Sequence, residues 1–146
     1  MIPTGAEPCR FCEIAGGEVP AWRVLEDEVS LAFLDRRPLF PGHILLIPRI
    51  HVATLPELPE ELVAPLFSMA RFLAGIVEEA LDAEGSFVAI NNRVSQSVPH
   101  LHVHIVPRHR GDGLKGFFWP RNPYRSEAET LVILEKLREA IGRHSR

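Results

Sequence analysis

Three histidines alternate with aliphatic residues in the run His100-Leu101-His102-Val103-His104-Ile105-Val106. This run limits the possible folds strongly, because successive side chains of a β-strand point to opposite faces of the sheet. A strand here places the three imidazoles on one face and the aliphatic side chains on the other, toward a core. An imidazole near pH 7 can act as a nucleophile, a proton carrier or a metal ligand. The pattern predicts a reactive strand face, and it leaves open whether that face binds a metal ion or attacks a substrate.

The length and composition of the chain favour one globular protein. Its 146 residues are enough for a single compact domain, and 46% are hydrophobic while 24% are charged. No apolar run approaches the ~20 residues that a membrane span needs, and the N-terminus lacks the basic and apolar regions of a signal peptide. We therefore expect a cytoplasmic protein without membrane contact. A net charge of -3 argues against binding bulk nucleic acid through overall charge.

The pattern of apolar residues predicts a mixed sheet and helix architecture. Strands are expected at residues 22–25, 29–34, 43–48, 87–91 and 101–107. A long helix is expected over 60–83, with an apolar stripe formed by Leu62, Leu66, Met69, Leu73, Ile76 and Ala80. Ser126 to Glu129 has the form of a capping box and opens a second helix that runs through residue 141. Short links between strands favour an antiparallel sheet of about five strands with helices packed on it, the α+β class.

The histidine run resembles the signature of the histidine triad (HIT) family, in which three histidines alternate with apolar residues. Further stretches match family patterns in family order, namely residues 9–14, 32–35, 42–49, His51 and 97–100. The resemblance covers about residues 9–108. It implies a single HIT domain over 1–146, whose core is 9–108 and whose C-terminal extension and helix occupy 109–146. It also implies a nucleotide hydrolase or transferase, acting where the α-phosphate of a nucleoside carries a leaving group.

The resemblance assigns catalytic roles within the run. His102 would attack the α-phosphorus and form a nucleotidyl-histidine intermediate, which water then hydrolyses. Such an intermediate divides one difficult step into two easier ones. His104 and Ser97 would stabilise charge on the phosphate oxygens or pass a proton. Adenosine substrates such as dinucleoside polyphosphates or AMP conjugates are expected from the resemblance alone.

The resemblance also assigns the nucleotide-binding residues. Asp35 would accept hydrogen bonds from the ribose hydroxyls, and an apolar pocket would hold the base. Two departures concern the phosphate loop: Ser95 stands where the family commonly has glycine, and residues 91–96 are about two residues shorter than usual. The full expected set is Phe11, Ile14, Phe33, Leu34, Asp35, Arg36, Asn91, Ser95, Gln96, Ser97, Val98 and His104.

Four further residues form a predicted metal site. Cys9 and Cys12 are too few for a disulfide framework, but with His51 and His100 they offer two thiolates and two imidazoles, a tetrahedral zinc set. Some bacterial-type HIT proteins hold structural zinc at matching positions. Four protein ligands close the coordination sphere, so the expected Zn²⁺ is structural. A divalent cation that accompanies the substrate remains open.

The segment from residue 108 to 125 combines basic and aromatic residues. Arg108, Lys115 and Arg121 suggest a preference for a long polyphosphate leaving group. The alternative is that the aromatics between them pack at a dimer interface. The resemblance implies a homodimer joined through its sheets, which would also cover an exposed edge strand.

Three rival functions remain open from the sequence. The first is nucleotidyl transfer to an acceptor other than water, or phosphorylase-type cleavage. The second is a non-catalytic nucleotide-binding sensor or partner-binding module that keeps the fold. The third is a metalloenzyme that uses the histidines of the triad as ligands for a catalytic ion.

Overall fold

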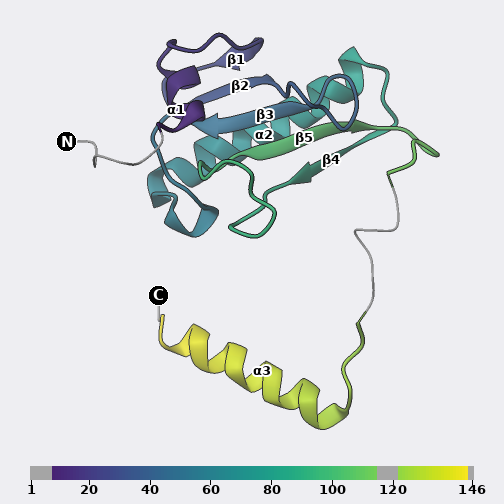
Figure 1. Ribbon diagram of the computed structural model, residues 1–146. Coiled ribbons are helices and arrows are strands. Elements are labelled where there is room, and N and C mark those ends of the chain that lie inside the picture. The colour runs from purple at the N-terminus through teal and green to yellow at the C-terminus, as the bar shows by residue number, and fades with distance from the viewer. Residues whose placement is uncertain (1–7, 115–121, 145–146) are drawn as a thin grey trace. The chain divides into compact units, whose positions relative to one another are not determined.

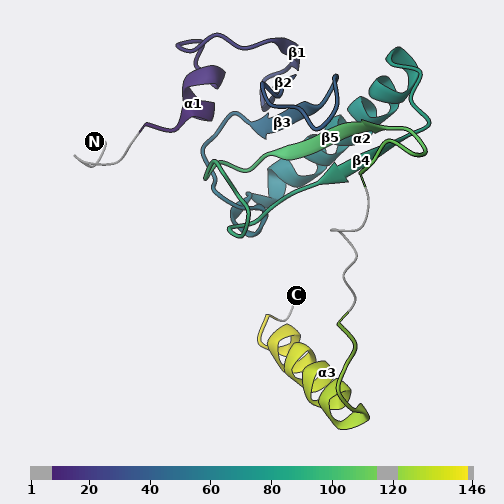
Figure 2. The same ribbon diagram turned by 45° about the vertical axis from the view of Figure 1, so that its right-hand side comes forward.

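A computed structural model describes residues 8–114 and 122–144 (Figures 1 and 2). The chain divides into two compact units, Met1–Asp112 and Gly113–Arg146. The first unit contains a five-stranded sheet with its helices, and the second contains helix α3 (Glu127–Gly142). Among the described residues, no helix is both long and apolar enough to cross a membrane. The predicted single domain over 1–146 stays a prediction.

The sheet is antiparallel throughout, in the order β1-β2-β3-β5-β4. This confirms the predicted α+β class. The order places β5, which contains the second half of the histidine run, between β3 and the edge strand β4. The strands are β1 (Arg23–Glu26), β2 (Ser30–Leu34), β3 (Ile44–Pro48), β4 (Gly85–Ala89) and β5 (Val103–Arg108).

The histidine strand begins later than its alternation predicts. Strand β5 starts at Val103 rather than at Leu101, so His100 and His102 lie in the segment that leads into it. The backbone N–H of Leu101 instead donates to the carbonyl of Val52 at 2.7 Å. Leu101, Val103 and Ile105 are fully buried, as the pattern predicts.

Helix α2 (Glu60–Ala80) covers one face of the sheet (Figure 1). Its buried residues are Leu66, Ala70, Leu73 and Val77, and they pack against Leu46, Val103 and Ile105. The buried face is therefore rotated slightly from the predicted stripe, in which Met69 and Ile76 are only half-buried and Ala80 is exposed. The spacing of the buried residues, three and four apart, still follows one face of a helix.

A short helix that the sequence pattern does not reveal packs near β2 and β3. Helix α1 (Arg10–Ala15) begins after Cys9, whose sulfur accepts the backbone N–H of Cys12 at 3.5 Å. Its Phe11 and Ile14 are buried in a second cluster with Leu31, Phe33, Leu45 and Ile47. One turn of 3₁₀ helix, η1 (Leu55–Glu57), precedes α2. Helix α1 therefore adds an apolar wall above the strands that lead to the histidines.

Helix α3 begins as its sequence predicts. The hydroxyl of Ser126 accepts the backbone N–H of Glu129 at 3.1 Å, which confirms this half of the predicted capping box. The side chains of Leu131, Leu137 and Ile141 are exposed in the structure. Lys115 and Arg121 of the basic segment lie outside the described residues.

Candidate functional site

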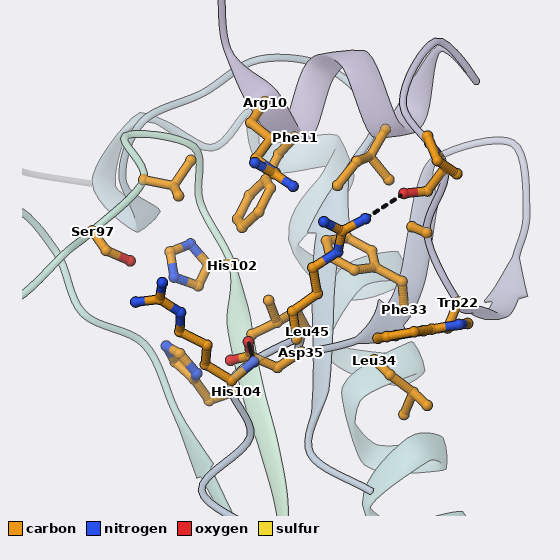
Figure 3. A pocket seen from close by; sticks show the side chains of 16 residues that line it. Arg10, Phe11, Trp22, Phe33, Leu34, Asp35, Leu45, Ser97, His102 and His104 are labelled. Atoms are coloured by element: carbon orange, nitrogen blue, oxygen red, sulfur yellow. Dashed lines mark hydrogen bonds between the residues drawn. The ribbon is translucent and has the colours of Figure 1, made fainter.

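A cavity of about 590 Å³ lies between helix α1, strand β2 and the residues around the start of β5 (Figure 3). This volume is within the range of pockets that bind small molecules. Figure 3 shows His102 and His104 side by side on one wall, Ser97 close to His102, and Phe11 next to the same ring. Trp22, Phe33 and Leu34 lie at the other end. The cavity therefore has a histidine end and an apolar end.

The local backbone fixes the tautomer of the neutral His102 ring. Its Nδ1 atom lies 2.7 Å from the carbonyl oxygen of His100. A carbonyl can only accept a hydrogen bond, so Nδ1 carries a proton, and in the neutral ring Nε2 keeps its lone pair. The ring of Phe11 packs edge-on against His102, with centroids 5.2 Å apart and an interplanar angle of 88°. A buried, oriented imidazole with a free Nε2 is the form that a nucleophile requires.

His104 lies beside His102, with ring centroids 4.9 Å apart. Burial, and then the nearby His102 and His43, lower the pKa of His104 to about 4. His104 is therefore neutral at pH 7 and can hold one proton on either nitrogen. Its Nδ1 is 3.0 Å from Nε2 of His43, a buried residue that immediately precedes β3. His43 is absent from the predicted site residues, although the expected strand at 43–48 begins with it.

The apolar end of the cavity contains the residues predicted to hold a base. Phe11 and Phe33 form an edge-to-face pair with centroids 5.4 Å apart, and Ile14, Leu34 and Asp35 line the same space. One carboxylate oxygen of Asp35 accepts the backbone N–H of Arg37 at 2.9 Å. The structure adds Trp22 and Leu45 to the predicted lining. No short-range pattern identifies Trp22, because it precedes β1 and reaches the cavity only through the β1–β2 pairing.

Three arginines also line the cavity, of which only Arg36 is predicted. A side-chain nitrogen of Arg36 lies 3.5 Å from the carbonyl of Pro20. In the part of the chain that the structure describes, no hydrogen bond or ion pair engages the guanidinium of Arg10 or Arg37. The cavity therefore offers positive charge to an anionic ligand.

The predicted phosphate loop divides into two parts. Ser97 and Val98 line the cavity, whereas Asn91, Ser95 and Gln96 do not. The amide of Gln96 closes the loop, since its nitrogen donates to the carbonyl of Ala53 at 2.6 Å and its oxygen accepts the N–H of Arg93 at 2.8 Å. Ser95 has a φ of 61°, in the left-handed region that favours glycine.

The four predicted metal ligands converge outside this cavity. The donor atoms of Cys9, Cys12, His51 and His100 all lie within 4.8 Å of one another. Nε2 of His100 lies 2.9 Å from the carbonyl of Pro48 and must donate to it, which leaves the Nδ1 lone pair directed at the sulfurs. Burial, and then the neighbouring Cys9, raise the pKa of the Cys12 thiol to about 11. A cation would reverse this preference, because it stabilises thiolates.

The spacing of the donor atoms fits a tetrahedral ion. The Nδ1 atoms of His51 and His100 are 3.3 Å apart, and the sulfur–nitrogen distances are 3.3 to 3.5 Å. A tetrahedral zinc with ordinary bond lengths has nitrogen–nitrogen edges of about 3.3 Å and sulfur–nitrogen edges of about 3.6 Å. The four distances given match such an ion, and all donor atoms lie within 4.8 Å of one another, so these residues could together hold a metal ion. His102 and His104 do not belong to this donor set.

Arg108 is the one member of the predicted basic set that the structure describes. Its guanidinium makes two hydrogen bonds to the carboxylate of Asp112, at 2.6 and 3.0 Å. It lines a small separate hollow with Glu84 and His109 rather than the cavity that holds His102. The positive charge at the reactive cavity comes instead from the three arginines near its rim.

Comparison with known proteins identifies the family. The HIT domain matches residues 16–111. An uncharacterized HIT-like protein of Mycobacterium tuberculosis is 37% identical over 135 residues, which are 89% of this chain and 93% of that protein. An adenosine 5'-monophosphoramidase of Schizosaccharomyces pombe is 36% identical over 82% of this chain and 88% of its own length.

A solved structure of a similar protein points to the same family as these two relatives. The Zn-bound histidine triad family protein from Mycobacterium smegmatis has a TM-score of 0.69 and 39% identity, covering 90% of this chain and 96% of its own. From the fold, the histidine run and the extent of these matches, we conclude that the protein belongs to the HIT family.

Proposed function

We propose that this protein hydrolyses nucleoside phosphate derivatives at the α-phosphorus through a covalent nucleotidyl-histidine on His102. The observation that carries the proposal is the hydrogen bond from His102 Nδ1 to the His100 carbonyl at 2.7 Å. It leaves a nucleophilic lone pair on a ring that lines a cavity large enough for a nucleotide. The Schizosaccharomyces pombe relative, an adenosine 5'-monophosphoramidase, supports an adenosine substrate.

The cavity supports a binding mode along its length. The base would lie among Phe11, Phe33 and Ile14, and Asp35 would accept hydrogen bonds from the ribose. One oxygen of Asp35 is already used by the Arg37 N–H, so the other is the expected acceptor. The α-phosphate would then lie at the histidine end, where Ser97 and His104 can donate to its oxygens.

In the proposed reaction, Nε2 of His102 forms a bond to the α-phosphorus as the bond to the leaving group breaks. The electron pair of the broken bond leaves with that group. Water then attacks the same phosphorus and displaces the imidazole, so the enzyme is regenerated. The arginines support an anionic leaving group such as a polyphosphate, because two of their guanidinium groups have no partner within the described chain.

We also propose that Cys9, Cys12, His51 and His100 bind a structural Zn²⁺. The fit of their distances to a tetrahedron supports this, as does the Zn-bound relative from Mycobacterium smegmatis. When bound, the ion would fix α1 to the segment before β5. Four protein ligands leave no open position for substrate, which argues against the metalloenzyme alternative. The homodimer, the cytoplasmic location and a cation accompanying the substrate stay predictions.

Trapping of the intermediate tests the catalytic proposal. The zinc-loaded protein is mixed briefly with a dinucleoside polyphosphate and quenched with denaturant at alkaline pH, because the phosphorus–imidazole bond breaks in acid. Intact mass is then measured. We expect one nucleotidyl group on the wild type and on His109→Ala, a variant outside the cavity, and none on His102→Ala. Tight binding without an adduct or turnover would instead indicate a nucleotide sensor.

A further inference from the structure

A second cluster of possible ligands lies beside the reactive histidines. Donor atoms of Asp35, His43 and His104 are within 4.8 Å of one another, which by distance alone resembles a metal site. His43 is 2% exposed and lies between the turn that follows β2 and strand β5. The hydrogen bonds of its two ring nitrogens show what the cluster does.

One backbone group determines the tautomer of His43. The N–H of Leu39 donates to Nδ1 of His43 at 3.1 Å. An amide nitrogen cannot accept a hydrogen bond, so Nδ1 is unprotonated and the neutral ring carries its proton on Nε2. The nearest oxygen of Asp35 is 3.8 Å away, too far for a hydrogen bond. Burial also lowers the pKa of His43, which keeps the ring neutral.

The proton on His43 in turn determines the tautomer of His104. Nε2 of His43 is 3.0 Å from Nδ1 of His104. Because His43 must donate in this contact, His104 must accept through Nδ1 and carry its own proton on Nε2. The Nδ1 lone pairs of both rings are therefore engaged by N–H groups. They do not converge on a shared point, so the cluster acts as a chain of hydrogen bonds rather than as a cation site.

We propose that His43 is a positioning residue that holds His104 as its Nε2–H tautomer, so that His104 presents a donor to a phosphate oxygen of the substrate. This inference rests on the proposed function, because only a bound nucleotide substrate supplies the phosphate oxygen to which His104 would donate. In the opposite tautomer, with the proton on Nδ1, the Nε2 lone pair of His104 would face the lone pairs of that phosphate oxygen. A donor fixed in advance needs no reorganisation when charge develops on the phosphate. The chain runs from the Leu39 N–H through His43 to His104.

Nitrogen NMR tests the tautomer without any activity measurement. Two-bond proton–nitrogen correlation spectra of ¹⁵N-labelled, zinc-loaded protein distinguish a protonated ring nitrogen from an unprotonated one. His104→Gln identifies the His104 signals. We expect a protonated Nε2 and an unprotonated Nδ1 on His104 in the wild type and in His109→Phe, a control at an exposed histidine. In His43→Phe, His104 should become a mixture of tautomers. A wild-type Nδ1 proton, or an unchanged tautomer in His43→Phe, would overturn the proposal.

Kinetics provide the second arm, with a variant that restores the donor. His43→Phe should lower kcat by about 10- to 100-fold with little change in KM, as expected for a misoriented partner. His43→Gln keeps an amide N–H that can reach His104 and should recover part of this loss. In the His104→Gln background, His43→Phe should cost little more. Additive losses, or no recovery by glutamine, would assign His43 a packing role only.

The two arms distinguish the failure of each proposal. If the wild type forms no nucleotidyl adduct, the proposed function fails, and the spectra still decide whether His43 sets the tautomer. If the adduct forms but the tautomer is independent of His43, the positioning role fails and the hydrolase remains.

Discussion

The candidate metal site and the reactive cavity divide one run of sequence between them, since His100 belongs to the first and His102 and His104 to the second, while His51 joins the first from another segment. In the candidate metal site, the Nδ1 atoms of His51 and His100 lie 3.3 Å apart, and each lies within 3.5 Å of a cysteine sulfur. In the cavity, His102 and His104 are each tied through Nδ1 to a separate partner, a carbonyl oxygen and another histidine. The difference teaches that alternation brings imidazoles together, while the groups bonded to each ring decide whether it binds a metal ion or meets a substrate.

The largest expected effect separates the two regions. Cys12→Ala removes one of the four proposed Zn²⁺ ligands and should lower the free energy of unfolding by at least about 3 kcal/mol, because loss of a metal is among the most damaging single changes. Metal analysis and thermal unfolding measure it. His102→Ala should keep its metal and its stability and lose turnover instead. Loss of zinc in His102→Ala would contradict the view that His102 serves the cavity and not the metal site.

The next effect concerns acid. Burial, and then His102 and His43, hold the pKa of His104 at about 4, below its ordinary value of 6.5. The unfolded chain therefore binds a proton here below pH 6.5 that the folded protein accepts only near pH 4. This contribution to stability is complete above pH 6.5 and is lost as the pH falls toward 4.

Denaturant unfolding at pH 7 and pH 5 checks this effect. His104→Gln removes the titrating group, so its stability should fall less between the two pH values than that of the wild type. Any effect of acid on the four predicted metal ligands is the same in both proteins, so it cancels when their changes in unfolding free energy are compared. Equal losses in both proteins would place the pH dependence elsewhere.

A smaller effect tests the charge of the cavity. Arg37→Ala should reduce kcat/KM for a dinucleoside polyphosphate by about 3- to 10-fold, the value of one hydrogen bond made by a solvent-exposed side chain. The kcat/KM for an AMP conjugate whose leaving group is an uncharged amine should change less, because that leaving group carries no phosphate. Arg71→Ala, on the exposed side of α2, is the matched control. Equal losses on both substrates would remove the link between Arg37 and the leaving group.

The smallest effect lies in the loop beside the cavity. Ser95 has a φ of 61°, and a glycine there would relieve the strain of the left-handed conformation while adding freedom to the unfolded chain. We expect Ser95→Gly to stabilise the protein by about 0.5 kcal/mol. Ser68→Gly, within helix α2, should destabilise it by about as much. Chemical denaturation measures both, and a destabilised Ser95→Gly would show that the loop needs the serine side chain.

Much of the fold could be predicted from local pattern. The strands, the long helix and the start of α3 follow from periodicity and capping, and the antiparallel sheet follows from short connections. Helix α1 could not, because six residues are too few to show a helical period. The exact buried face of α2 also depends on which side chains β3 and β5 present to it, which no single segment reveals.

The site was predictable where residue type alone carries the chemistry. The four predicted metal ligands lie within 4.8 Å of one another, and most of the residues predicted to hold a base line one cavity. The phosphate loop differs, because the side chain of Gln96 bonds to Ala53, far away in the sequence. The role of His43 depends on an N–H of Leu39 and a ring on another strand. Such tautomers are decided by tertiary contacts and have no sequence signal of their own.

The first helix has a consequence for how the protein responds to its surroundings. Six residues cannot sustain a helix by their own hydrogen bonds, yet α1 carries Phe11 against His102, contains Cys12 and begins directly after Cys9. Loss of the proposed Zn²⁺, by chelation or by thiol oxidation, would release this helix at one edge and open the cavity to solvent. The capture of substrate by the proposed enzyme would then depend on the supply of metal as well as on the imidazole of His102.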